Sequence, residues 1–159
     1  MSKIALVLRE LHRSQASLAH ELHALTDRHV GDHEIVHTAR DLAGWARDDL
    51  RRLEDTARAC DVRILAWPRP GLGGGLTRRV AGSLVHRPEP GLLLLADLRR
   101  LYRKAAGVDL DWTLLAQSAQ AMRQRRLLDL ATTCAPHSRR TMTWAQAQLK
   151  VVSPQIIAS

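Results

Sequence analysis

An apolar stripe with helical spacing runs through the first 28 residues and constrains the fold more than any other feature. Its members recur at steps of three and four residues, with Gln15 in the one position where an apolar residue is missing: Ile4, Leu8, Leu11, Leu18, Leu22 and Leu25. Side chains at this spacing lie on one face of an α-helix. A single helix cannot bury such a face alone, so a helix over residues 3–28 requires partners that cover it.

A second stripe of the same period follows over residues 31–60. Its members are mostly small: Val36, Ala39, Ala43, Ala46, Leu50, Leu53, Ala57 and Cys60. The connection around His29 and Gly31 is short, and a short connection makes two helices antiparallel neighbours. The composition agrees with an all-α fold, because the chain has no Phe and one Tyr, whereas Leu, Ala and Arg, which favour helices, dominate.

The second half of the chain predicts another pair of helices. A third helix is expected over residues 91–106, with Gly107 ending it. A fourth helix is expected to begin near Asp109 or Asp111, either of which can cap it, and to be kinked or split at Pro136.

A long crossover over residues 61–90 separates the two pairs, because this stretch is rich in Pro and Gly. Two helix pairs joined by one long crossover are the layout of a ferritin-like four-helix bundle. We therefore expect a single bundle domain over residues 1–152 and a C-terminal tail over residues 153–159.

Length and hydropathy exclude a membrane protein of the helical type. The chain has 159 residues, enough for one domain, and its longest purely apolar runs, residues 4–8 and 92–96, are far shorter than the roughly 20 residues that a spanning helix needs. Residues 1–3 lead into the helical pattern without a signal-peptide pattern. Cys60 and Cys134 are too few for a disulfide framework. These features predict a cytoplasmic protein.

The sharpest local motif is His33-Glu34-x-x-His37, on the second expected helix. Histidines four residues apart share a helical face and can bind zinc, with the intervening Glu as general base of a hydrolase. His20 and His23 come level with this segment in an antiparallel hairpin, so a surface metal site is a further interpretation. The plain alternative is a polar, solvated helix face.

The same residues contain Glu34-x-x-His37, the spacing that ferritin-like bundles use to bind iron or manganese. Glu21 on the first helix is a candidate partner, so the candidate metal ligands are His33, Glu34, His37 and Glu21. A complete di-metal site needs a second Glu-x-x-His on the other helix pair. Residues 108–151 contain no Glu, which predicts an incomplete or vestigial site.

Charge is distributed unevenly along the chain. The formal net charge is +8, and residues 62–159 hold 15 Lys and Arg against 5 Asp and Glu. Two basic groups in this half are candidates for binding nucleic-acid phosphates: Arg99, Arg100, Arg103 and Lys104, and Arg123, Arg125 and Arg126. A solvated helix face is the alternative, because no DNA-binding motif accompanies these residues.

Several segments resemble small, uncharacterised ferritin-like helical proteins of actinobacterial type. They are residues 87–98, Arg28-His29, residues 32–34 and residues 144–155. The resemblance covers nearly the whole chain. It implies a cytoplasmic four-helix bundle and assigns no substrate.

The leading functional hypothesis is a non-catalytic bundle that acts by association with itself or with a protein partner. The helical stripes are well formed, whereas the polar constellation is incomplete. Trp45 and Trp67 lie off the main stripes and are candidate interface residues. Iron or manganese binding through Glu34 and His37, zinc hydrolysis and nucleic-acid binding are the alternatives.

Overall fold

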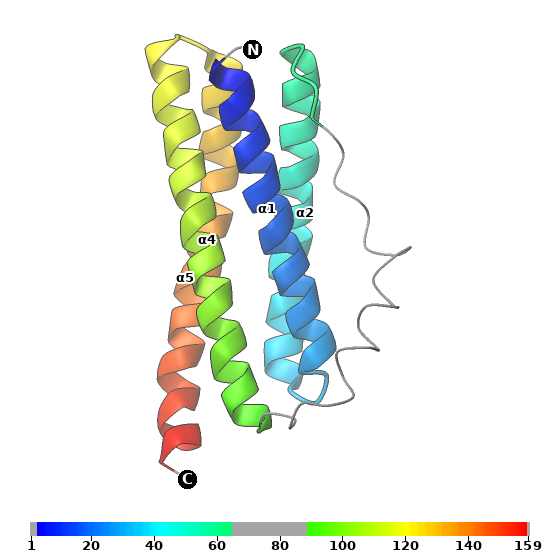
Figure 1. Cartoon of the computed structure of the whole chain (residues 1–159), viewed down its shortest axis with the longest axis vertical. Helices are drawn as coiled ribbons and strands as arrows, with labels where there is room; N and C mark the ends of the chain where they lie inside the picture. Colours follow the sequence, from blue (N-terminus) through cyan, green and yellow to red (C-terminus); the bar gives the residue numbers. More distant parts are fainter. Residues whose placement is uncertain (1–2, 65–88, 159) are drawn as a thin grey trace.

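The computed structural model describes residues 3–64 and 89–158, and these residues form four long helices and no strand (Figure 1). The helices are α1 (Lys3–Arg28), α2 (His33–Ala59), α4 (Pro90–Ala121) and α5 (Arg125–Ile157). The all-α prediction is therefore confirmed. Most of the expected crossover, and Trp67, lie outside the described residues. No described helix is long and apolar enough to cross a membrane.

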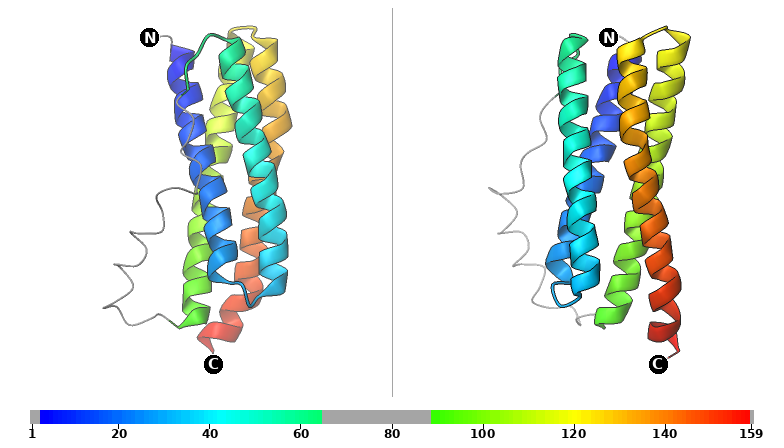
Figure 2. Two further views of the ribbon diagram at one scale, coloured as in Figure 1. Left: turned by 90° about the vertical axis from the view of Figure 1, so that its right-hand side faces the viewer. Right: turned by 180° about the vertical axis from the view of Figure 1, so that it is seen from behind.

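Each helix packs against two neighbours, which places the four helices at the corners of a bundle (Figures 1 and 2). Helix α1 contacts α2 and α4, and α5 contacts α2 and α4. Ser14 contacts Asp111 and Arg28 contacts Asp97, so α1 and α4 are antiparallel. Since α1 is antiparallel to α2 as well, α2 and α4 run in the same direction at opposite corners (Figure 1).

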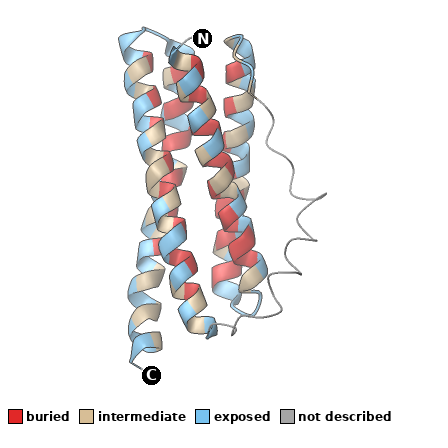
Figure 3. Ribbon diagram, viewed as in Figure 1, coloured by how far each residue is buried: buried red, intermediate tan, exposed pale blue. Residues whose placement is uncertain are grey.

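The stripe of α1 forms one side of the core. Its members from Leu8 to Leu25 are at most 1% exposed (Figure 3). Gln15, the polar residue within that stripe, is also buried: its amide donates to the Ala46 carbonyl, and its carbonyl accepts from the Trp112 indole at 3.3 Å. The polar position in the stripe thus joins three helices inside the core, since Ala46 lies on α2 and Trp112 on α4.

Helix α4 continues through Gly107 to Ala121, so the predicted end at 106 is wrong. The buried residues of α4 lie on one continuous face of the helix on both sides of Gly107: Leu94, Leu98, Leu101, Ala105, Val108, Trp112, Leu115 and Ala119. This burial outweighs the roughly 1 kcal/mol that glycine costs inside a helix. Asp109 and Asp111, predicted as caps, lie within α4 instead.

The turn between α4 and α5 lies at residues 122–124. Arg123 has φ 55°, a left-handed conformation, and the Gln124 amide bonds back to the Ala119 carbonyl at 2.8 Å, which ends α4. Helix α5 is one helix through Pro136, so the predicted split is wrong, whereas the alternative of a kink there stays a prediction. Pro136 is exposed, where water can satisfy the carbonyl that proline leaves unpaired. Residues 153–157 of the expected tail belong to α5.

Candidate functional site

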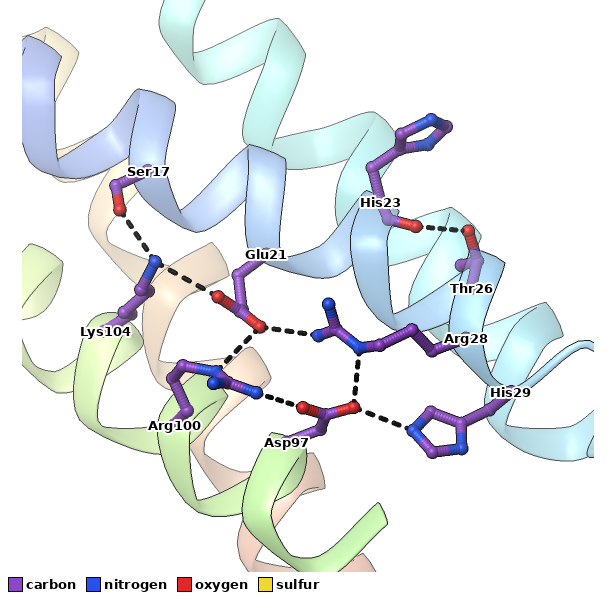
Figure 4. Close-up of polar contacts among 9 residues, drawn as sticks. All are labelled: Ser17, Glu21, His23, Thr26, Arg28, His29, Asp97, Arg100 and Lys104. Carbon is purple, nitrogen blue, oxygen red and sulfur yellow. Dashed lines mark hydrogen bonds and ion pairs between the residues drawn. The ribbon is translucent and has the colours of Figure 1, made fainter. Parts of the chain in front are cut away.

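Two buried carboxylates lie between α1 and α4 in a network of ion pairs (Figure 4). Glu21, on α1, pairs with Arg28 at 2.9 Å, with Arg100 at 3.0 Å and with Lys104 at 3.1 Å. Its side chain is 8% exposed. The Lys104 ammonium also donates to the Ser17 hydroxyl at 3.0 Å. The Glu21 carboxylate therefore forms ion pairs with three cations at once.

Asp97, on α4, is the second carboxylate and is fully buried. Its Oδ2 accepts from the Arg28 Nε at 2.8 Å and lies 2.8 Å from the His29 Nε2, while its Oδ1 pairs with Arg100 (Figure 4). Arg28 and Arg100 thus bridge both carboxylates. The network fixes the end of α1 against the first half of α4.

The cations decide the protonation of both carboxyl groups. Burial alone would raise the pKa of Glu21, but Lys104, Arg100 and Arg28 outweigh it and hold that pKa below its ordinary value. Burial would also raise the pKa of Asp97, but hydrogen bonds and charges from His29, Arg28 and Arg100 outweigh burial and lower that pKa. Both groups are therefore ionised at neutral pH.

A basic recess opens on the solvent side of this network. It measures about 460 Å³ and is lined by Ala96, Arg99, Arg100, Arg103 and Lys104, all on α4. Arg100 and Lys104 reach back to Glu21, whereas Arg99 and Arg103 are exposed.

The second basic group predicted from the sequence does not join this recess. Arg123, Arg125 and Arg126 lie around the turn between α4 and α5. At 1.5 Å per residue, the 18 steps along the helix from Arg103 to Ala121 span about 27 Å. The seven basic residues therefore form two separate groups rather than one patch.

A groove of mixed lining lies between α1 and α4 on the other half of the same face. It measures about 580 Å³. Three apolar and five polar residues line it: Leu6, Val7 and Leu114, and Glu10, Arg13, Ser14, Ser17 and Asp111. Leu6 is 52% exposed, Leu114 is 50% exposed, and Leu110, one turn from Leu114, is 70% exposed. Leu6 and Leu114 thus face solvent across the groove, and Leu110 faces solvent one turn along α4 from Leu114.

The candidate metal ligands do not form a cluster. His33, Glu34 and His37 are exposed at the start of α2, where Asp32 caps the Ile35 amide and Glu34 suits the positive end of the helix dipole. The Glu21 carboxylate is already paired with three cations and is not free to bind a metal ion. Within residues 3–64 and 89–158, no group of three or more His, Cys, Asp or Glu side chains could hold a metal ion.

A polar pair between α2 and α5 was not predicted from the sequence. The His137 Nδ1 lies 2.9 Å from both carboxylate oxygens of Asp49, which is 1% exposed. The His137 ring stacks on Trp45, and the Arg140 guanidinium lies over Trp45 at 5.2 Å. Trp45, a candidate interface residue, is half-buried against the bundle core, and its role at an interface stays a prediction.

The pKa shifts around Asp49 indicate that the Asp49–His137 pair is structural and not reactive. Burial raises the pKa of Asp49 even though His137 opposes the shift. Burial and the Asp49 carboxylate together raise the pKa of the Cys134 thiol far above its usual range. A thiol in this environment stays protonated and is a poor nucleophile.

Comparisons with known proteins identify no relative. No family model, curated protein or solved structure matches the chain.

Proposed function

We propose that the protein is a non-catalytic, ferritin-like helical bundle that acts by forming a dimer through α1 and α4. The order and direction of the helices support the ferritin-like part of this proposal. Two antiparallel pairs, α1 with α2 and α4 with α5, are combined so that α2 and α4 are parallel. A ferritin-like bundle, with its single long crossover, has this layout.

The observation that carries the proposal is the exposed group of Leu6, Leu110 and Leu114. Monomeric proteins rarely keep neighbouring large apolar side chains in water, and such patches mark interaction surfaces. Each of the three leucines is at least half exposed, whereas Leu8 and Leu11 on α1 and Leu98 and Leu101 on α4 are fully buried. The rim of the groove carries both signs of charge, because Glu10 and Arg13 pair at 2.9 Å.

A second copy of this chain is the occupant that we propose for this surface. In a two-fold symmetric dimer, antiparallel α4 helices centred near Trp112 bring Leu110 of one copy opposite Leu114 of the other. Leu6 then flanks the pair from α1. The same apolar surface serves both copies, as a symmetric dimer requires.

The polar clusters favour association over catalysis. Glu21, Asp97 and Asp49 are each engaged in ion pairs, and in the described part of the chain no buried side-chain polar atom lacks a hydrogen-bond partner. Saturated clusters of this kind stabilise helix packing, because unpaired polar groups would be costly to bury.

Sedimentation velocity over a range of protein concentrations tests the proposal. The wild-type chain is expected to sediment as a dimer at high concentration. Leu110→Lys/Leu114→Lys is expected to remain a monomer, because two charges cannot be buried at the centre of the interface.

Val151→Lys is the matched control, because Val151 is also exposed, at 57%, but lies on α5. It should dimerise like wild type, and circular dichroism should find all three proteins equally helical. A wild-type protein that is monomeric at every concentration would overturn the proposal.

A further inference from the structure

Two arginines on the outward face of α4 have no counter-charge in the part of the chain that the structure describes. Arg99 and Arg103 are exposed, and neither has an ion-pair or hydrogen-bond partner among residues 3–64 and 89–158. They lie four residues apart, on one face of the helix, and like charges at this spacing repel. An anion between them would remove that repulsion.

The other two cations of the basic recess are held in place by ion pairs to buried carboxylates. Arg100 and Lys104 border the recess and are tied to Glu21 at 3.0 Å and 3.1 Å. Arg100 also pairs with Asp97. Because these side chains are already ordered, binding a ligand to them costs less conformational entropy than binding to free side chains.

The local charge balance is positive on the solvent side. Four cations line the recess, and the two carboxylates that pair with the inner cations are buried: Arg99, Arg100, Arg103 and Lys104, against Glu21 and Asp97. The side chains of Glu21 and Asp97 are 8% and 0% exposed. The carboxylates therefore orient the inner cations while the outer face stays available to an anion.

We propose that this recess binds a compact ligand through its phosphate groups. Guanidinium groups match phosphate oxygens in planar, bidentate hydrogen bonds. The recess is an open surface site lined by one helix, so a phosphate group can reach all four cations from solvent. The recess is confined to residues 96–104. Exposed Leu110 and Leu114 separate it from the arginines at the far end of α4, which favours a compact ligand over a nucleic-acid strand.

Isothermal titration calorimetry with inorganic pyrophosphate tests the site at constant ionic strength. Wild-type protein is expected to bind pyrophosphate. Arg99→Gln/Arg103→Gln should weaken that binding by about tenfold or more, through loss of charge-assisted hydrogen bonds. Arg40→Gln/Arg47→Gln removes the same charge from exposed positions on α2 and should bind like wild type.

Further titrations separate the possible sources of phosphate. Binding to phosphatidylcholine vesicles only when they contain phosphatidic acid, lost in Arg99→Gln/Arg103→Gln, would support the site with a lipid as its source. Pyrophosphate binding without vesicle binding would support a soluble ligand. Equal loss in both arginine variants, no pyrophosphate binding, or binding only to a single-stranded oligonucleotide would overturn the proposal.

The dimer and the phosphate site are tested separately. The Leu110→Lys/Leu114→Lys variant leaves residues 96–104 unchanged and should retain pyrophosphate binding even as a monomer.

Discussion

Asp97 shows how a buried charge can stabilise the contact of two helices. Its carboxylate pairs with Arg28, His29 and Arg100, and removal of the carboxylate would leave these three side chains without that partner. Breaking a fully buried pair costs about 3–5 kcal/mol. Arg28 and Arg100 are 29% and 48% exposed and can rehydrate, so the cost here should be smaller.

We expect Asp97→Asn to lower the free energy of unfolding by about 2 kcal/mol. Urea unfolding followed by circular dichroism measures this change. Asp48→Asn is the control, because Asp48 pairs with Arg51 at the exposed surface and its loss should change stability by less than about 0.5 kcal/mol. Equal effects of the two substitutions would contradict the structural role of Asp97.

The lowered pKa values of Glu21 and Asp97 predict acid sensitivity. Their ordinary values are 4.5 and 3.8, and both are lower in the folded chain, so the unfolded chain takes up protons first as the pH falls. The stability that they supply is complete above those ordinary values and is lost as the pH falls through the lowered ones. Asp49 contributes with the opposite sign, because its pKa is raised.

Urea unfolding at pH values from 7 to about 3 should therefore show stability falling most steeply below about pH 4.5. The Asp97→Asn variant should lose less stability over that range than wild type. An identical pH dependence in the two proteins would show that the network does not titrate as described.

Some site residues could be predicted from the sequence and some could not. Asp97 and Asp49 stand at buried phases of their helices, between Leu94 and Leu98 and between Ala46 and Leu53, so a search for acids within the stripes would have found them. Their partners could not be found in this way, because Arg28 and His137 come from other helices. Pairing between helices depends on rotation and register, which one helical stripe does not determine.

At the scale of the helices, Gly107 is a position where sequence propensity and packing disagree. Glycine favours a helix end, yet the buried residues of α4 continue in phase beyond it. A methyl group at Gly107 would meet no atom within 4 Å. Gly107→Ala should therefore raise the free energy of unfolding by about 0.5–1 kcal/mol, because alanine favours a helix.

Thermal unfolding measures this gain. Gly91→Ala is the matched control, because its Cβ would lie 3.0 Å from two side-chain carbon atoms of Ile156, and it should give a smaller gain or a loss. A destabilised Gly107→Ala variant would mean that α4 is strained or bent at that residue in solution.

The ends of the first two helices were easier to predict than those of the second pair. Asp32 and Gly31 stand where one stripe stops and the next begins, and α2 starts directly after them. Between α4 and α5, the turn at residues 122–124 contains neither Gly nor Pro, and Arg123 takes the left-handed conformation itself. Standard turn signals therefore pointed to Gly107, 15 residues too early.

At the scale of the whole molecule, the stripes predict four helices in two antiparallel pairs, and the described residues contain four helices in that arrangement. The sequence pattern could not tell which faces remain uncovered. The exposed leucines of α1 and α4 follow from how the pairs pack, because Leu6 and Leu114 border the groove between the pairs.

Hydrogen–deuterium exchange at low and high protein concentration tests the central claim, that α1 and α4 form the interface of a dimer. On dimer formation, we expect slower exchange in α4 around residues 110–117 and in α1 around residues 3–13. The exposed face of α2, including residues 40–51, should exchange at the same rate at both concentrations. Protection on α2 or α5 instead, or no change with concentration, would contradict the claim.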